Sequence, residues 1–166
     1  MRVKVFSIVC GLITSLLVES AYADQLSDAT QAFERKDSSR AYETWHRLAE
    51  QGDAEAQFQL GEMCAGGRLY SAGKGFLCST KDSRIWTLKA AEKRHTKAML
   101  SLSMRYLTGL GAPEDFAQAH MWANLATING GWDARNDLRD LEELLSPEQI
   151  TEGQRLAREW LDRHPI

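Results

Sequence analysis

Residues 56–64 read AQFQLGEMC and residues 98–106 read AMLSLSMRY, so the first alanine and the leucine at the fifth position recur 42 residues apart. Farther along the chain, residues 73–75 (GKG) match residues 109–111 (GLG) at an offset of 36 residues. Self-similarity at a period of this size is typical of a repeat protein. The difference between the two offsets places six additional residues in the first unit, between its first segment and its glycine turn.

Each unit is predicted to contain two helices joined by its glycine turn. Ala56, Leu60 and Met63 follow the three- and four-residue spacing of an amphipathic helix. Glycine interrupts the helix at the turn and allows positive φ angles there. After the turn, Ser79 in the first unit and Asp115 in the second occupy equivalent positions, and we expect their side chains to cap the second helix.

The flanking sequence extends the helical pattern in both directions. We expect an N-terminal capping helix pair over residues 24–53 and C-terminal capping helices over residues 132–166. Between them, residues 54–131 form the two repeats, namely 54–96 with the insertion and 97–131. Strand signals are nearly absent. The predicted fold is therefore all-α, with about eight helices stacked as antiparallel hairpins in a short α-solenoid.

Tryptophan positions support this arrangement. Trp86 and Trp122 repeat at the 36-residue offset, and Trp45 and Trp160 also lie on apolar helix stripes. These four residues are expected in the core. Trp132 follows two glycines and is expected nearer the surface.

The first 23 residues have the features of a secretory signal peptide. Arg2 and Lys4 give a basic start, residues 5–18 contain no charge, and a small-x-small pattern ends at Ala23, where cleavage is predicted. A membrane anchor is disfavoured because 14 apolar residues are fewer than the roughly 20 that span a bilayer. Cys10 lacks the small preceding residue of a lipoprotein site.

Removal of this segment changes the overall charge. The full chain has 166 residues, with 20 basic and 23 acidic side chains and a formal charge of −3. Without residues 1–23 it has 143 residues and a charge of −4, because two basic residues and one acidic residue are lost. Mild acidity without a basic block argues against a nucleic-acid partner. No membrane span is predicted after cleavage.

Two cysteines, Cys64 and Cys78, remain in the processed chain. An even pair in an oxidising compartment predicts a disulfide. It would close a loop of 13 residues that contains the insertion, which is worth about 3 kcal/mol in the chain-entropy description. The alternatives are two buried thiols or a metal site, and the latter lacks a second Cys or His pair for tetrahedral ligation.

The motif Ala-x-x-x-Leu-Gly-x-Met, followed by Gly-x-Gly, a capping residue and a tryptophan before Ala-Ala or Leu-Ala, resembles the Sel-one-like repeat (SLR) family. This family is related to the tetratricopeptide repeat (TPR). Residues 45–57 (WHRLAEQGDAEAQ) and 145–150 (LSPEQI) are especially similar to exported bacterial members, and the likeness covers about residues 28–163. Cys64 in place of tyrosine, Arg105 in place of methionine and the insertion depart from the pattern.

The resemblance implies a right-handed, TPR-like superhelix whose concave face binds another protein, and it implies no chemistry. We accordingly predict no catalytic residue, no metal site and no cofactor. His46, His95, His120 and His164 lack metal-ligand spacing and are expected on solvated helix faces. The Gly-x-Gly segments follow predicted helices, so they indicate turns rather than a nucleotide site. No Gly-x-Ser-x-Gly elbow is present, and neither cysteine of the pair has the setting of a catalytic thiol.

Candidate partner-binding residues are polar or exposed positions on the first helix of each unit, which lines the inner face of a helical stack, together with two residues of the insertion. Arginine and tyrosine in an exposed loop are types enriched at interface hot spots. The alternative is that this loop is a stapled excursion without a binding role. The predicted residues are Gln59, Glu62, Arg68, Tyr70, Ser101, Met104 and Arg105.

The expected function is that of a periplasmic or secreted, non-enzymatic adaptor or regulator that binds another exported protein. The chain also resembles some immunity proteins of this family, which neutralise toxic effectors delivered to the periplasm. One alternative is a cell-wall or β-lactam hydrolase of the cysteine-rich repeat type, although the paired-cysteine pattern and a nucleophile–base pair are lacking. An envelope assembly chaperone is the other alternative, and the sequence does not separate it from an adaptor.

Overall fold

The computed structural model describes residues 24–65, 78–111, 113–131 and 133–165. The predicted signal peptide, the insertion with Arg68 and Tyr70, the first glycine turn and Trp132 lie outside the described residues. The described chain forms eight helices and no strand, which confirms the all-α prediction. The helices are residues 24–34, α2 (Ser38–Glu50), α3 (Ala54–Ala65), α4 (Thr80–Glu92), α5 (Thr96–Thr108), α6 (Phe116–Ile128), α7 (Ala134–Glu142) and α8 (Pro147–Arg163).

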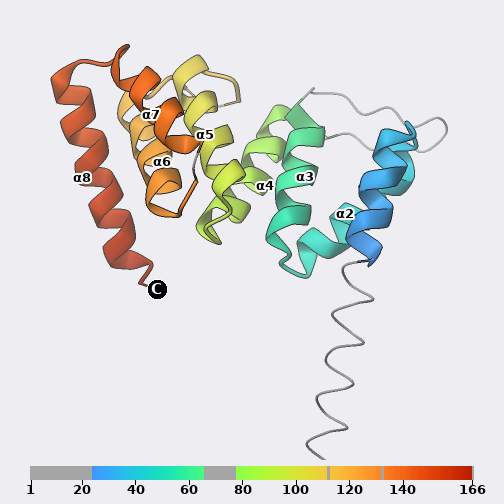
Figure 1. The fold of residues 1–166 in the computed structure, drawn as a ribbon. Helices are drawn as coiled ribbons and strands as arrows, with labels where there is room; N and C mark the ends of the chain where they lie inside the picture. The colour runs from blue at the N-terminus through green and yellow to red at the C-terminus, as the bar shows by residue number, and fades with distance from the viewer. Residues whose placement is uncertain (1–23, 66–77, 112, 132, 166) are drawn as a thin grey trace, which may run out of the picture.

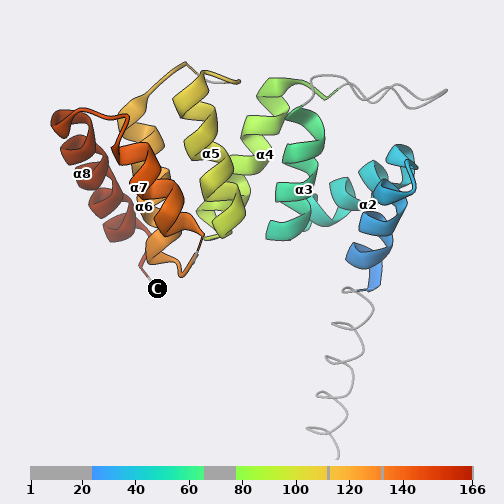
Figure 2. The ribbon, with the colours of Figure 1, turned by 45° about the horizontal axis from the view of Figure 1, so that its top comes forward.

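The helices follow one another along a row, from α2 at one end of the molecule to α8 at the other (Figures 1 and 2). Helix α3 packs on α4 and α5 packs on α6, so each predicted repeat is one hairpin, and the α4–α5 contact joins the two hairpins. Both α7 and α8 pack on α6. The predicted short solenoid of helix hairpins is therefore confirmed.

Side-chain caps fix where the second helices and the last helix begin. Ser79 and Asp82 form a reciprocal capping box at the start of α4, and Ser146 and Gln149 form another at α8. Asp115 accepts a hydrogen bond from the backbone N–H of Gln118, as predicted for α6. The backbone N–H of Asp115 itself donates to the carbonyl at the end of α5, which ties this cap to the preceding helix.

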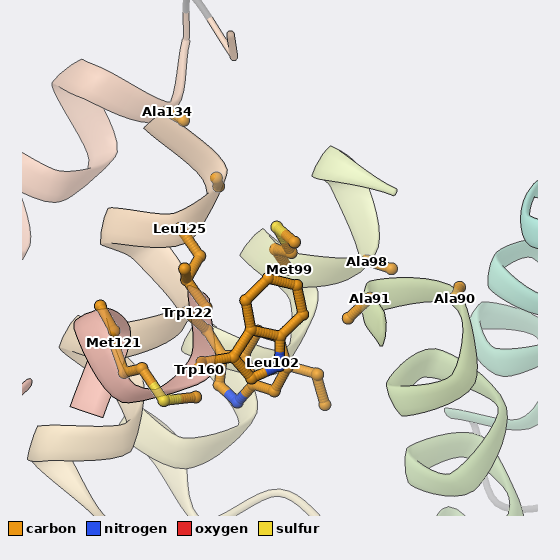
Figure 3. Close-up of a cluster of buried hydrophobic side chains, with 12 residues drawn as sticks. Ala90, Ala91, Ala98, Met99, Leu102, Met121, Trp122, Leu125, Ala134 and Trp160 are labelled. Atoms are coloured by element: carbon orange, nitrogen blue, oxygen red, sulfur yellow. The ribbon is translucent and has the colours of Figure 1, made fainter. Parts of the chain in front are cut away.

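The hydrophobic core has two large parts. The N-terminal part joins residues 24–34 to α2 and α3, where Trp45 and Leu48 are fully buried. The C-terminal part lies between α4, α5, α6, the start of α7 and α8, and there the Trp122 and Trp160 rings meet edge-to-face with centroids 6.0 Å apart (Figure 3). Core positions are thus confirmed for three of the four tryptophans. Trp86 is only half-buried, at the edge of the N-terminal part.

A disulfide joins Cys64, in the last turn of α3, to Cys78, just before α4. Both residues are buried in the N-terminal core, with Cα atoms 5.2 Å apart. The predicted bridge is confirmed, and it connects the two helices of the first repeat at the end where the insertion lies. In the second repeat, Gly109 and Gly111 have the positive φ angles expected for the glycine turn.

Candidate protein-binding surface

Three of the predicted partner-binding residues form one hydrogen-bonded cluster that bridges the first helices of the two repeats. Nη2 of Arg105 donates to Oε1 of Glu62 at 2.8 Å, and the hydroxyl of Ser101 donates to the same oxygen at 2.7 Å. Nε of Arg105 also donates to the Ser101 hydroxyl at 3.2 Å. This Glu62–Ser101–Arg105 cluster fixes α5 relative to α3.

Arg105, a candidate as a polar position of α5, is buried, because only 4% of its surface is accessible. The methionine that the motif would place here suits a buried position, and arginine at this site is accommodated by pairing with Glu62. Glu62 remains 43% exposed in its side chain, so a partner can still reach one end of the cluster. Arg105 therefore positions Glu62 and Ser101 and presents little surface of its own.

A second polar cluster bridges the same two helices one to two turns away. Nδ1 of His95 accepts the backbone N–H of Ala98 at the start of α5, so the ring proton lies on Nε2 and is donated to Glu55 at 2.8 Å. Gln59 donates to the other carboxylate oxygen at 2.6 Å. The hydrogen bond from His95, aided by that from Gln59, lowers the pKa of Glu55 to about 2. The predicted residue Gln59 thus orients an ionised carboxylate.

Beside these clusters, an apolar groove with a volume of about 370 Å³ opens between α5 and α7. Met104 lines it and is 58% exposed, which agrees with its prediction as a surface residue. Leu144, just after α7, lines the opposite wall and is 72% exposed. The sequence does not predict this wall. Residues 132–166 are expected only as capping helices, and α7 lines the groove only because it packs against α6.

The groove walls are two helical stripes that face each other. From the α5 side come Leu100, Ser103, Met104 and Leu107, and from the α7 side come Asp137, Asp140, Leu141 and Leu144. Both sets follow the spacing i, i+3, i+4, i+7, which puts the α5 set on one face of its helix. The same holds for Asp137, Asp140 and Leu141 of α7, and Leu144 follows in the turn after that helix. Ala123 of α6 forms the floor between them.

His120 corrects the expectation that the histidines are solvated. It is 1% exposed, and its Nε2 lies 2.9 Å from a carboxylate oxygen of Glu142 in α7. Its ring also packs against the backbone of Gly153 in α8. His120 therefore holds three helices together. His95 is likewise mostly buried, whereas His46 is more exposed and faces Glu50 at 3.7 Å.

The described part of the chain has no group of three or more His, Cys, Asp or Glu side chains placed to hold a metal ion. None of its helices combines the length and apolar character that a membrane crossing requires. The candidate site therefore consists of the two polar clusters between α3 and α5 and the groove between α5 and α7.

Comparison with known proteins bears on the fold. No model of a known protein family matches the sequence. A protective antigen of uropathogenic Escherichia coli that displays an SLR fold superposes with a TM-score of 0.74 over 86% of this chain, at 24% sequence identity. The chain has the SLR fold. The SLR resemblance seen in the repeat motifs is thus confirmed at the level of structure.

A second SLR structure, a Sel1 repeat protein from Oxalobacter formigenes, matches 70% of the chain with a TM-score of 0.59 and 26% identity. In sequence, the chain is 36% identical over 93 residues, or 55% of its length, to chitin synthase regulatory factor 3 of Schizosaccharomyces pombe. The matched region covers 9% of that protein, and the present chain covers 30% and 46% of the two SLR structures. It therefore spans less than half the length of each relative.

Proposed function

We propose that this SLR-fold chain is a non-catalytic interaction module that binds another protein on the face formed by α3, α5 and α7. The observation that supports this most directly is the open groove, where Met104 of α5 and Leu144, just after α7, expose apolar side chains from opposite walls. Exposed apolar surface with a polar surround is characteristic of protein interaction sites. The Glu62–Ser101–Arg105 cluster stiffens the adjoining part of the face.

We place the protein outside the cytoplasm, in the periplasm or secreted. The buried Cys64–Cys78 disulfide supports this, since structural disulfides persist in oxidising compartments. The basic start and uncharged run of residues 1–18 support export through a signal peptide cleaved after Ala23. The partner is then another exported protein.

Within this function, the role of adaptor or regulator is supported by the sequence relative, whose name describes a regulatory factor. An immunity role is the narrower version of the same proposal, with an antibacterial effector as the partner. No described contact favours the hydrolase alternative, because His95 and His120 hydrogen-bond to glutamates and to no described hydroxyl or thiol.

A site-specific photo-crosslinker tests this proposal. Benzoylphenylalanine replaces Met104 on the proposed face, and, as a matched control, Ile85 of α4, which is similarly exposed at 47% but lies outside it. We expect irradiation of producing cells to give a discrete adduct with one envelope protein from position 104 and not from position 85. Identical adduct patterns from both positions, or no adduct from position 104, would contradict the assignment.

A further inference from the structure

The groove between α5 and α7 is shaped for a third helix. Its walls repeat at i, i+3, i+4 and i+7 on both sides, which is the ridge spacing that helices use when they pack on one another. An extended strand, whose side chains alternate every two residues, would not match this spacing. The four residues of each stripe extend over eight positions, which corresponds to about 10 Å of helix axis, or two turns.

The floor of the groove explains why it stays open. Ala123 is 1% exposed and packs with Ala119 and Leu141 in a small core cluster beneath the groove. Both α5 and α7 rest on α6 through this cluster, and the small alanine side chains leave the space above them unfilled. Met104 and Leu144 stand at the two sides of that space with most of their surface in solvent.

The charges at the groove are acidic. Asp137 and Asp140 both line the α7 wall, one turn apart. Asp140 is 3.1 Å from Arg139, but both side chains are 68% exposed, so this pairing is weak. Asp137 has no ion-pair partner within the described residues. No basic side chain lines the groove itself.

From this geometry we infer that the groove binds a basic amphipathic α-helix of the partner protein, two to three turns long. Leucine-like side chains of that helix fill the space between Met104 and Leu144, and lysine or arginine side chains beside them pair with Asp137 and Asp140. The inference rests on the proposed function, because it names the element of the partner that the face recognises. Helix docking into an apolar groove is an established mode of recognition, and complementary charge sets orientation and association rate.

Binding of designed peptides to the purified, oxidised chain tests this inference. The probe is a fluorescent 14-residue helix, closed by an i,i+4 lactam, with leucine at i, i+3, i+4, i+7 and lysine on the flanks. One comparison peptide has the same composition with the leucines dispersed around the helix, and another has glutamate for each lysine. We expect the probe to bind at least about tenfold more tightly than either comparison peptide.

Groove variants give the second arm of the test. Met104→Gln combined with Leu144→Ser is expected to weaken binding of the probe roughly tenfold. Asp137→Asn with Asp140→Asn is expected to weaken binding of the probe and to reduce the dependence of its affinity on salt concentration. These side chains are exposed, so circular dichroism is expected to stay unchanged. Ile85→Gln and Asp162→Asn, exposed residues on α4 and α8, are the matched apolar and acidic controls and leave binding unaltered.

The inference would be overturned if the acidic or the dispersed peptide bound as tightly as the probe. It would also be overturned if the control variants lost as much probe binding as the groove variants. A dimer of this chain that Met104→Gln with Leu144→Ser dissociates in sedimentation would overturn it as well, since a second copy would then occupy the groove. If position 104 crosslinks to a partner while no basic helix binds, the helix assignment fails and the interaction function stands. If the basic helix binds through the groove residues but no protein is crosslinked, the groove assignment is supported and the cellular function fails.

Discussion

In both repeats, the two helices of the hairpin face each other at one pair of equivalent positions. The two repeats place the smaller residue of this pair on different helices. In the first repeat, a Cβ atom on Gly61 would lie 2.5 Å from Oγ1 of Thr87 and 3.1 Å from its backbone nitrogen. At the repeat offsets of 42 and 36 residues, Ser103 replaces Gly61 and Ala123 replaces Thr87 in the second repeat. Each contact therefore keeps one small residue, on the first helix in one repeat and on the second helix in the other.

The hydrogen bond across this contact also runs in opposite directions in the two repeats. Ser83 of α4 donates to the carbonyl of Gly61 at 2.6 Å, whereas Ser103 of α5 donates to the carbonyl of Ala119 at 2.8 Å. In each repeat, the donating serine lies on the helix opposite the small residue. A single substitution that adds volume on the wrong helix is consequently expected to disturb the hairpin.

Gly61→Ala is predicted to destabilise the protein by about 1–2 kcal/mol, because overpacking costs 1–3 kcal/mol and the better helix propensity of alanine recovers up to about 1. In a Thr87→Ala background, the same substitution is predicted to cost less, since the clashing hydroxyl is gone and only the tight contacts with the α4 backbone remain. Urea unfolding of the four proteins in this cycle measures the coupling. Additive effects, with no recovery in the double variant, would contradict the packing argument.

At the scale of elements, α8 packs on α6 through the Trp122–Trp160 contact and through a second, closer approach at Gly153. A Cβ atom on Gly153 would lie 2.6 Å from Nδ1 and 2.7 Å from Cβ of His120, so only glycine lets the helices meet at this distance. The imidazole is held in place from the other side by Glu142 of α7. The position of α7, and with it one wall of the groove, thus depends on the same buried histidine that receives α8.

Gly153→Ala is predicted to cost more than about 2 kcal/mol, because the ring is confined and the clash involves its Cβ and ring atoms rather than a flexible side-chain end. Gln154→Ala, on the exposed side of α8, is the control and is expected to change stability by less than about 0.5 kcal/mol. Chemical denaturation followed by tryptophan fluorescence measures both, since Trp160 packs in the core beside this junction. Similar midpoints for the two variants would show that α8 adjusts without strain.

Local sequence signals predicted the elements well and their assembly less well. Helix starts after Ser79 and Asp115 follow from capping chemistry, which acts within four residues. The burial of Arg105 does not follow from the local sequence, because its partner Glu62 lies 43 residues earlier. The groove is not predictable from local sequence for the same reason, since its two walls come together only when α5 and α7 both pack on α6.

At the scale of the whole molecule, the core is divided along the row of helices. Residues 24–34, α2 and α3 share one apolar cluster, and α4 to α8 share another. In a repeat architecture each unit contacts its neighbours, so stability is close to a sum of local terms. The Cys64–Cys78 bridge belongs wholly to the first cluster and lies at the end of the first hairpin.

Reduction of this disulfide is therefore predicted to act locally. The reduced protein, or the Cys64→Ser and Cys78→Ser double variant, is expected to lose up to about 3 kcal/mol, the cost of freeing a loop of this size. Because the bridge lies in the N-terminal cluster and Cys78 immediately precedes α4, amide hydrogen exchange is expected to accelerate in α2, α3 and α4, while α6 and α8 keep most of their protection. Exchange measured by mass spectrometry with and without reductant separates the two halves, and the oxidised chain serves as the control. A uniform loss of protection from α2 to α8 would show that the two clusters unfold as one unit and that the division of the core has no energetic meaning.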